Sequence, residues 1–214
     1  MKHLQLSPPL LIITMGYPGS GKSYFVRQFA ELYGLARVSE DRIRYELFET
    51  PTFSDDEFDI IGRVEQYMLE QIMRTERTII CEGIFMKTVE RKQLLELARS
   101  NGYRTLTVWL QTDVETSIQR SSTRDRRNPD SKYTFAVDTA TFNRMKNNLQ
   151  KPGEREPAVV VSGKHAFKSQ CLTVLRKIAA MYSDSVSKGD FGVKPDSVKR
   201  PTSIRVRSTD QLIQ

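Results

Sequence analysis

One glycine-rich segment near the N-terminus constrains the fold more than any other feature. Residues 16–23 read GYPGSGKS and fit the pattern G-x-x-x-x-G-K-[ST] at every fixed position. The apolar run Leu10–Met15 before this segment shows no polar alternation, which is typical of a strand buried on both faces. Residues 24–33 after it place apolar side chains at helical spacing and stop at Gly34, a typical helix cap. A strand, a glycine turn and a helix therefore follow one another.

The residue types in this turn indicate what it binds. Its glycines permit backbone angles that side chains disfavour, so successive N–H groups can surround a β-phosphate at the positive end of the following helix. Lys22 can then reach the β- and γ-phosphates, and the Ser23 hydroxyl can bind a Mg²⁺ ion that bridges them. We therefore predict a site for ATP with Mg²⁺, in which the nucleotide contacts Gly16, Pro18, Gly19, Ser20, Gly21, Lys22, Ser23 and Tyr24.

The glycine turn admits two other interpretations. An ordinary glycine-rich turn is one alternative, but the strand before it and the helix after it are placed as a phosphate-binding loop requires. A Rossmann dinucleotide site is disfavoured because the glycine spacing is different. In addition, Lys22 and Ser23 follow the last glycine directly, which suits a nucleoside triphosphate.

The pattern of strand and helix recurs along the chain. After the first strand, we expect strands at residues 36–39, 78–82, 105–111 and 158–161. Further helices are expected at residues 41–49, 56–74, 89–100, 114–120 and 167–182. Strands that alternate with helices at these intervals form parallel βαβ units. The sequence therefore predicts a three-layer, doubly wound α/β fold with helices on both faces of a five-stranded parallel sheet.

Two charged segments lie outside this alternation. Residues 120–138 are polar and lack core periodicity, which is typical of a functional lid in a compact domain. From residue 183 onward the composition shifts to Ser, Asp, Lys, Gly, Pro and Arg, as in a flexible tail. We expect one domain over residues 1–182, with the lid at about 120–138, and a flexible tail over residues 183–214.

Composition narrows the setting and the partners. The formal net charge of +7 favours anionic partners such as nucleotides, phosphorylated metabolites or nucleic acid. The longest apolar run is far shorter than a bilayer span and no secretory signal pattern is found, so we expect no membrane partner. Cys81 and Cys171 are too few for a disulfide framework or a metal cluster, which favours a cytoplasmic location.

Two charged residues after the second expected strand can serve a phosphoryl acceptor. Asp41 lies just beyond that strand, at the edge where ligands of open α/β sheets bind, and Arg44 follows one helical turn later. The carboxylate can orient and deprotonate an attacking hydroxyl, while the arginine can hold an acceptor phosphate or the carboxylate itself. The same spacing equally fits an exposed acidic helix cap with an ion pair, so both interpretations stay open.

These motifs resemble those of a known group of proteins. GYPGSGKS at residues 16–23 and SEDRIR at residues 39–44 resemble the P-loop kinase group that includes the kinase domain of polynucleotide 5′-kinase/phosphatase, zeta-toxin-like kinases and many small ATP-dependent kinases. The likeness spans residues 10–182. It implies the strand order 2-3-1-4-5, Asp41 as general base and Arg44 as an acceptor-binding arginine.

The resemblance also implies roles for residues after the later strands. Glu82 ends the third strand and is expected to face the crevice, where it can bind Mg²⁺ through water or contact the acceptor. Related proteins usually have an aspartate in this region, and a carboxylate at the edge of the core is the alternative. Residues 162–165 fall where related proteins often contact the adenine or ribose.

The arginines of the expected lid form the last part of the predicted site. We expect Arg120 to contact the nucleotide, and Arg124 and Arg127 to act catalytically by stabilising charge on the transferring phosphoryl group. Arg126 belongs to the same run. A solvated basic loop without a catalytic role is the alternative interpretation.

The leading hypothesis is an ATP-dependent kinase that phosphorylates a hydroxyl of a small molecule or of a nucleic-acid 5′ end. The basic tail supports nucleic acid, although its aspartates and scarce aromatic residues argue against this. An ATP-binding switch or ATPase module without a phosphorylated acceptor is the alternative from another class. A nucleoside monophosphate kinase would need several phosphate-binding arginines at residues 42–63, where Arg44 and Arg63 make a thin case.

Overall fold

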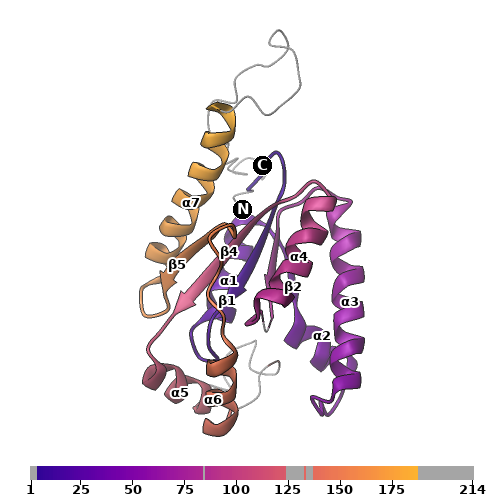
Figure 1. Cartoon of the computed structure of the whole chain (residues 1–214), viewed down its shortest axis with the longest axis vertical. Helices are drawn as coiled ribbons and strands as arrows, with labels where there is room; N and C mark the ends of the chain where they lie inside the picture. The colour runs from indigo at the N-terminus through magenta and orange to yellow at the C-terminus, as the bar shows by residue number, and fades with distance from the viewer. Residues whose placement is uncertain (1–3, 84, 124–132, 134–136, 188–214) are drawn as a thin grey trace, which may run out of the picture.

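The structure is a computed structural model that describes residues 4–83, 85–123, 133 and 137–187. These residues form a parallel sheet of five strands with helices on both faces (Figure 1). The predicted lid residues Arg124 and Arg127 lie outside the described residues, and so do residues 188–214 of the predicted tail.

The strands form where the apolar runs predicted them. Their bounds are β1 (Leu10–Met15), β2 (Ala36–Ser39), β3 (Ile79–Glu82), β4 (Arg104–Gln111) and β5 (Ala158–Ser162). Every residue of β1 is buried, as expected for a strand that helices cover on both faces. The order in the sheet is β2-β3-β1-β4-β5, which confirms both the doubly wound fold and the order that the resemblance implied.

The helices follow the expected order with one addition. They are α1 (Lys22–Tyr33), α2 (Glu40–Leu47), α3 (Asp55–Met73), α4 (Thr88–Ser100), α5 (Val114–Ser122), α6 (Thr139–Asn148) and α7 (Phe167–Ser187). Helix α7 continues past residue 182, where the sequence suggested that the domain ends. None of the described helices combines the length and the apolar content that a membrane span requires.

Helix α6 was not predicted, and its composition explains why. Phe142 is its single buried residue, so no periodic apolar stripe marks the helix in the sequence. Its start is nevertheless signalled locally, because the side chain of Asp138 accepts a hydrogen bond from the backbone N–H of Thr141.

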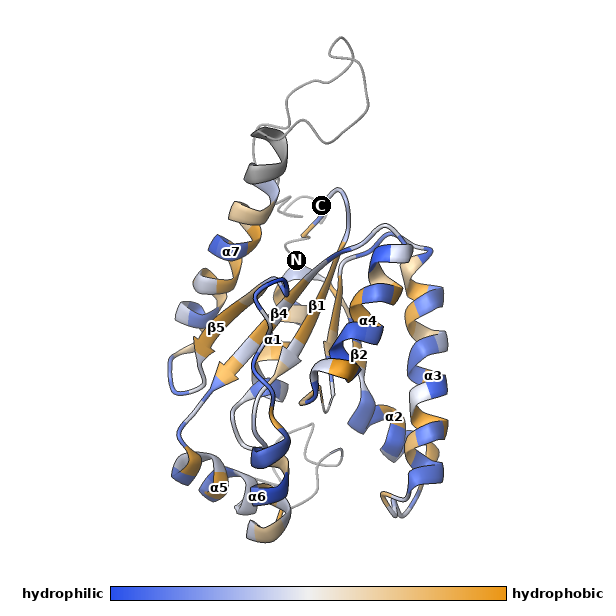
Figure 2. Cartoon of the chain, viewed as in Figure 1, coloured by the Kyte–Doolittle hydropathy of each residue, from blue (hydrophilic) through white to orange (hydrophobic). Residues whose placement is uncertain are grey.

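The helices bury the sheet between two apolar layers. Alternate residues of β1 point to opposite faces: Leu10 and Ile12 pack with α1 and α7, while Leu11 and Ile13 pack with α3 and α4. Strands β1 and β5 are accordingly hydrophobic along most of their length, whereas the helices carry hydrophilic residues beside their apolar ones (Figure 2). The sheet is thereby held rigidly enough to position the loops at its ends.

Because the strands are parallel, their carboxyl ends gather at one edge of the sheet. Ser39 of β2, Glu82 of β3 and Thr14 of β1 lie in register next to one another at this edge. The Thr14 hydroxyl donates a hydrogen bond to the carbonyl oxygen of Cys81 at 3.0 Å, which joins β1 to β3 close to their ends. The loops that leave these strands carry the predicted site residues.

Candidate active site

The P-loop, residues 16–23, leaves β1 at the carboxyl edge and enters α1. Gly16, Gly19 and Gly21 have φ angles of 149°, 78° and 96°, a region that favours glycine. A Cβ atom on Gly19 would lie 2.2 Å from the backbone oxygen of Ser117 in α5. Glycine is therefore needed for the conformation of the loop and for its close packing on α5.

Lys22 and Ser23 lie where the loop becomes a helix. The Lys22 ammonium donates hydrogen bonds to the carbonyl oxygens of Gly16 and Tyr17 at 2.8 and 3.0 Å. Ser23 is partly exposed in the first turn of α1. Among the described residues no side chain caps this helix end, and its first turn carries no acidic residue. Its partial positive charge and the loop amides thus suit a phosphate group.

The loop after β5 packs against the P-loop from the other side. A Cβ on Gly163 would lie 2.0 Å from the carbonyl oxygen of Ser20, and the Thr112 hydroxyl donates to the same oxygen at 3.3 Å. The Arg120 guanidinium donates to the carbonyl oxygen of Gly163 at 3.1 Å. Arg120 and residues 162–165 therefore border the P-loop together. Thr112 was not singled out from the sequence, although it directly follows a strand at the carboxyl edge.

The other residues predicted to contact the nucleotide differ in exposure. Pro18 is partly exposed, and Tyr24 is 49% exposed with its ring edge-on to Phe167. Ser20 is fully buried, and its hydroxyl oxygen has no hydrogen-bond partner among the described residues. The backbone of the loop rather than these side chains is therefore the prominent feature of the phosphate site.

Asp41 lies at the N-terminus of α2, two residues after the end of β2. The Ser39 side chain caps this helix by accepting a hydrogen bond from the backbone N–H of Arg42. Asp41 is partly exposed in the first turn, where the helix dipole favours a negative charge. The structure thus positions a carboxylate at the same sheet edge as the P-loop.

Arg44 lies deeper than the resemblance implied. Its side chain is fully buried, donates to a Glu40 carboxylate oxygen at 2.9 Å and forms a second ion pair with Glu57 of α3. The guanidinium also lies over the rings of Phe53 and Phe58, 4.8 and 4.4 Å from their centroids. Direct binding of an acceptor by Arg44 would require these ion pairs to open.

Glu57 completes this buried network. Its carboxylate accepts hydrogen bonds from the backbone N–H groups of Thr52 and Phe53, at 2.7 and 3.0 Å, in addition to its contact with Arg44. Burial alone would raise the pKa of Glu57, but these hydrogen bonds outweigh it and lower the pKa to about 2. The network ties the first helical turns of α2 and α3 together.

Glu82 lies between the P-loop strand and the strand that leads to Asp41. It is 4% exposed, and its carboxylate accepts a hydrogen bond from the Arg37 guanidinium at 2.9 Å. Arg37 was not selected from the sequence. Its signal was an arginine inside the otherwise small and apolar strand β2, where a buried charge requires a partner.

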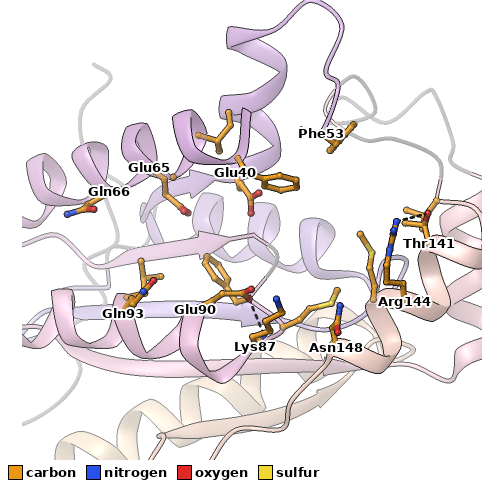
Figure 3. A pocket seen from close by; sticks show the side chains of 18 of the residues that line it. Glu40, Phe53, Glu65, Gln66, Lys87, Glu90, Gln93, Thr141, Arg144 and Asn148 are labelled. Carbon is orange, nitrogen blue, oxygen red and sulfur yellow. Dashed lines mark hydrogen bonds between the residues drawn. The ribbon is translucent and has the colours of Figure 1, made fainter. Parts of the chain in front are cut away.

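A cavity of about 1160 Å³ opens beside Glu40, between α3, α4 and α6 (Figure 3). Helix α6 also contacts the P-loop, because the ring centroids of Phe142 and Tyr17 lie 5.7 Å apart. The buried carboxyl group of Glu65 belongs to the cavity lining, and burial together with the nearby charge of Glu40 raises its pKa to about 8. The cavity thus borders Glu40 at the start of α2, whereas Asp41 and the P-loop residues are not part of its described lining.

Metal binding needs few protein ligands in such a site. The described residues contain no cluster of three or more His, Cys, Asp or Glu side chains arranged for a metal ion. A Mg²⁺ ion that takes most of its ligands from phosphates and water needs only one or two oxygens from the protein. The Ser23 hydroxyl and the Glu82 carboxylate have the right chemistry for such a role.

Comparisons with known proteins agree with this arrangement. Residues 11–152 match the AAA_33 family, described as an AAA domain. Comparison of the sequence with curated proteins gives no match.

Solved structures with the same fold include several kinases. A sugar kinase from Janibacter sp. HTCC2649 superposes with a TM-score of 0.61 at 16% identity, over 80% of this chain and 95% of that chain. A gluconokinase from Sinorhizobium meliloti 1021 superposes with a TM-score of 0.60 at 16% identity, over 84% of this chain and 97% of that chain.

The Pnkp1/Rnl/Hen1 RNA repair complex contains a similar chain as well. It gives a TM-score of 0.58 at 18% identity, over 70% of this chain and 45% of that chain. At these identities the likeness establishes the fold, and the family match covers the P-loop and the cavity helices. The chain therefore belongs to the AAA_33 family of AAA domains.

Proposed function

We propose that this protein is a kinase that transfers the γ-phosphate of ATP to a hydroxyl group of a bound acceptor, with Mg²⁺ as cofactor. The observation that carries this proposal is the arrangement at the carboxyl edge. The P-loop follows β1, Asp41 follows β2 two strands away, and the cavity beside Glu40 offers space for a second substrate. A nucleotide switch needs the P-loop but has no use for a second substrate site.

The P-loop residues would hold the triphosphate. Backbone N–H groups of the loop and the N-terminus of α1 bind phosphate oxygens, and Lys22 exchanges its loop carbonyls for the β- and γ-phosphates. Ser23 and Glu82 would hold Mg²⁺, Glu82 through water. The ion, when bound with ATP, neutralises charge on the β- and γ-phosphates. Arg120, which donates to the carbonyl oxygen of Gly163, would contact the nucleotide on the side of residues 162–165.

Asp41 would act as general base for the acceptor. Its carboxylate accepts the hydroxyl proton while the acceptor oxygen forms a bond to the γ-phosphorus. The bond between that phosphorus and the bridging oxygen breaks, and ADP leaves. In this proposal Arg44 is a positioning residue, because its ion pairs with Glu40 and Glu57 hold the first turn of α2 in place.

Three expectations from the sequence stay predictions. Arg124 and Arg127 lie outside the described residues, so their catalytic role rests on their place after the fourth βα unit. The cytoplasmic location rests on composition. The nature of the acceptor, a small molecule or a nucleic-acid 5′ end, is the third of these predictions.

Transfer of labelled γ-phosphate tests this proposal. The full chain is incubated with Mg²⁺ and labelled ATP together with sugars, amino sugars, nucleosides and 5′-hydroxyl oligonucleotides. We expect one acceptor class to be labelled, with labelling abolished by Lys22→Ala and strongly reduced by Asp41→Asn. Asp59→Asn, an exposed acid-to-amide change on α3, is the matched control and should leave labelling unchanged. ATP hydrolysis without any labelled acceptor, unaffected by Asp41→Asn, would establish the switch instead.

A further inference from the structure

The cavity beside Glu40 is acidic in a basic protein. The chain carries a formal net charge of +7. Two of the residues that line the cavity, Lys87 and Arg144, are cationic, and five are acidic: Glu40, Glu65, Glu90, Glu96 and Asp138. The local charge is thus opposite in sign to the charge of the whole protein. An acceptor bound here meets carboxylates rather than the basic groups expected for a nucleic acid.

Most of these carboxylates have a structural role. Glu40 pairs with Arg44 at 2.9 Å, Glu90 accepts a hydrogen bond from the backbone N–H of Lys87 at 3.0 Å, and Asp138 caps α6. Glu96 is exposed to solvent. Three contacts and the exposure of Glu96 account for four of the five acidic groups and leave Glu65 to be explained.

Glu65 is a buried carboxyl group without a compensating partner in the described structure. Its residue is 9% exposed, and one of its carboxyl oxygens, Oε1, accepts no hydrogen bond from any described residue. Figure 3 shows its side chain extending from α3 into the space between α3 and α4, on the same side as Glu40. Burial and the charge of Glu40 raise its pKa to about 8. A cation placed here would favour the ionised carboxylate and so offset both causes.

An aromatic ring lies beside the Glu40 carboxylate. A Cβ on Gly83 would come within 2.9 Å of the Phe85 ring and 3.0 Å of the Glu40 carboxylate, so both groups crowd over this glycine. Phe85 and Glu40 line the cavity together with Glu65. Carboxylates next to an aromatic ring form an environment that attracts an ammonium group.

Resting on the proposed kinase function, we propose that the acceptor is an amino alcohol whose protonated amine binds Glu65 while its hydroxyl is phosphorylated. Glu40 adds negative charge beside this contact and Phe85 covers it. A phosphate or carboxylate on the acceptor would instead be buried near the charge of Glu40 and would disfavour ionisation of Glu65, a cost that Coulomb repulsion imposes. This chemistry favours a small cationic acceptor over the 5′ end of a nucleic acid.

The test uses acceptors that differ in charge but share a carbon skeleton. Glucosamine is compared with glucose and gluconate, and 2-amino-1,3-propanediol with glycerol. A 5′-hydroxyl oligonucleotide serves as a polyanionic probe. We expect kcat/KM for the amine to exceed that of its neutral partner at least tenfold. Glu65→Gln should bring this ratio close to one through KM, whereas Asp59→Asn on the same helix should not change it. Preference for a neutral or anionic acceptor would overturn the inference and leave the kinase standing.

Thermal unfolding with the same probes separates the two proposals if nothing is phosphorylated. Amines that raise Tm of the wild type, but not of Glu65→Gln, would support the ammonium site while the proposed transfer reaction fails. Equal Tm changes for amines and their neutral partners, or an equal response of the Glu65→Gln variant, would overturn the inference.

Discussion

The two halves of the candidate site are built in different ways. On the nucleotide side, the P-loop meets α5 and the loop after β5 through backbone atoms, with glycines where a Cβ would lie about 2 Å from a neighbouring oxygen. On the acceptor side, side chains make the contacts. A buried ion pair and an aromatic ring join α2 to α3, and a cavity lies between α3, α4 and α6. A backbone cradle recognises a triphosphate, which is common to many enzymes, whereas side chains can adapt to one acceptor.

Among variants that keep Lys22, removing the base at the junction of the two halves should have the largest effect. Asp41→Asn keeps the shape of the side chain but cannot take the proton from the acceptor. We expect kcat to fall by roughly 10²–10⁴-fold, the range for a lost general base. Stopped-flow measurement of ATP binding, run in parallel, should give an unchanged Kd. If the Kd for ATP rose by a factor comparable to the fall in kcat, Asp41 would serve nucleotide binding instead.

A methyl group added to the P-loop should weaken ATP binding without changing the acceptor side. In Gly19→Ala the new Cβ would clash with the Ser117 carbonyl, and φ would stay in a region that disfavours alanine. We expect the Kd for ATP to rise by about tenfold to a hundredfold, from a strain of about 1–3 kcal/mol. Gly153→Ala is the matched control, because a Cβ there meets no atom within 4 Å. Equal Kd values for both variants would argue against a tightly packed loop.

Breaking the buried ion pair should disrupt the acceptor side. Glu57→Ala removes a partner of the fully buried Arg44, and such a loss costs about 3–5 kcal/mol of the free energy of unfolding. Denaturant unfolding at pH 7 measures this change. We further expect Kd for ATP to remain close to the wild-type value in the folded protein, in contrast to Gly19→Ala.

The ion pair between Arg44 and Glu57 also predicts how the free energy of unfolding changes at acidic pH. The pKa of Glu57 is lowered from 4.5 to about 2 in the folded state. The folded state therefore binds this proton less readily, and the stabilisation is present above pH 4.5 and lost as pH falls towards 2. Glu57→Gln should flatten the unfolding free energy over this interval. A slope equal to that of the wild type would assign acid unfolding to other groups.

The buried carboxyl group of Glu65 predicts a pH dependence of the opposite sign. The pKa of Glu65 is raised to about 8, so its contribution to stability is present below pH 4.5 and lost as pH rises through 8. Glu65→Gln should therefore raise Tm of the ligand-free protein by a few degrees at pH 9 and change it little at pH 4. Thermal scans at both pH values measure this. A lower Tm of the variant at pH 9 would show that Glu65 is already neutralised by a partner.

The sequence was informative where neighbouring residues determine the structure. The glycine motif and the apolar run Leu10–Met15 specified the P-loop between a buried strand and a helix. Helix α6 was not predicted because Phe142 is its only buried residue. Arg44 was expected to bind the acceptor because residue spacing shows which side chains share a helix face. Spacing does not show which face is buried, and Arg44 lies on the buried face. Contacts such as Arg37 with Glu82 join residues far apart in sequence, which local patterns cannot pair.

By itself the sequence determined the parallel α/β fold and the phosphate loop, because hydrophobic periodicity and glycine conformation act over a few neighbouring residues. The tertiary structure alone decided the acceptor side: which helices enclose the cavity, that Arg44 is buried between Glu40 and Glu57, and that Glu65 faces the cavity. The physical reason is that burial raises the energetic cost of an unpaired charge, and burial exists only once distant segments have packed together.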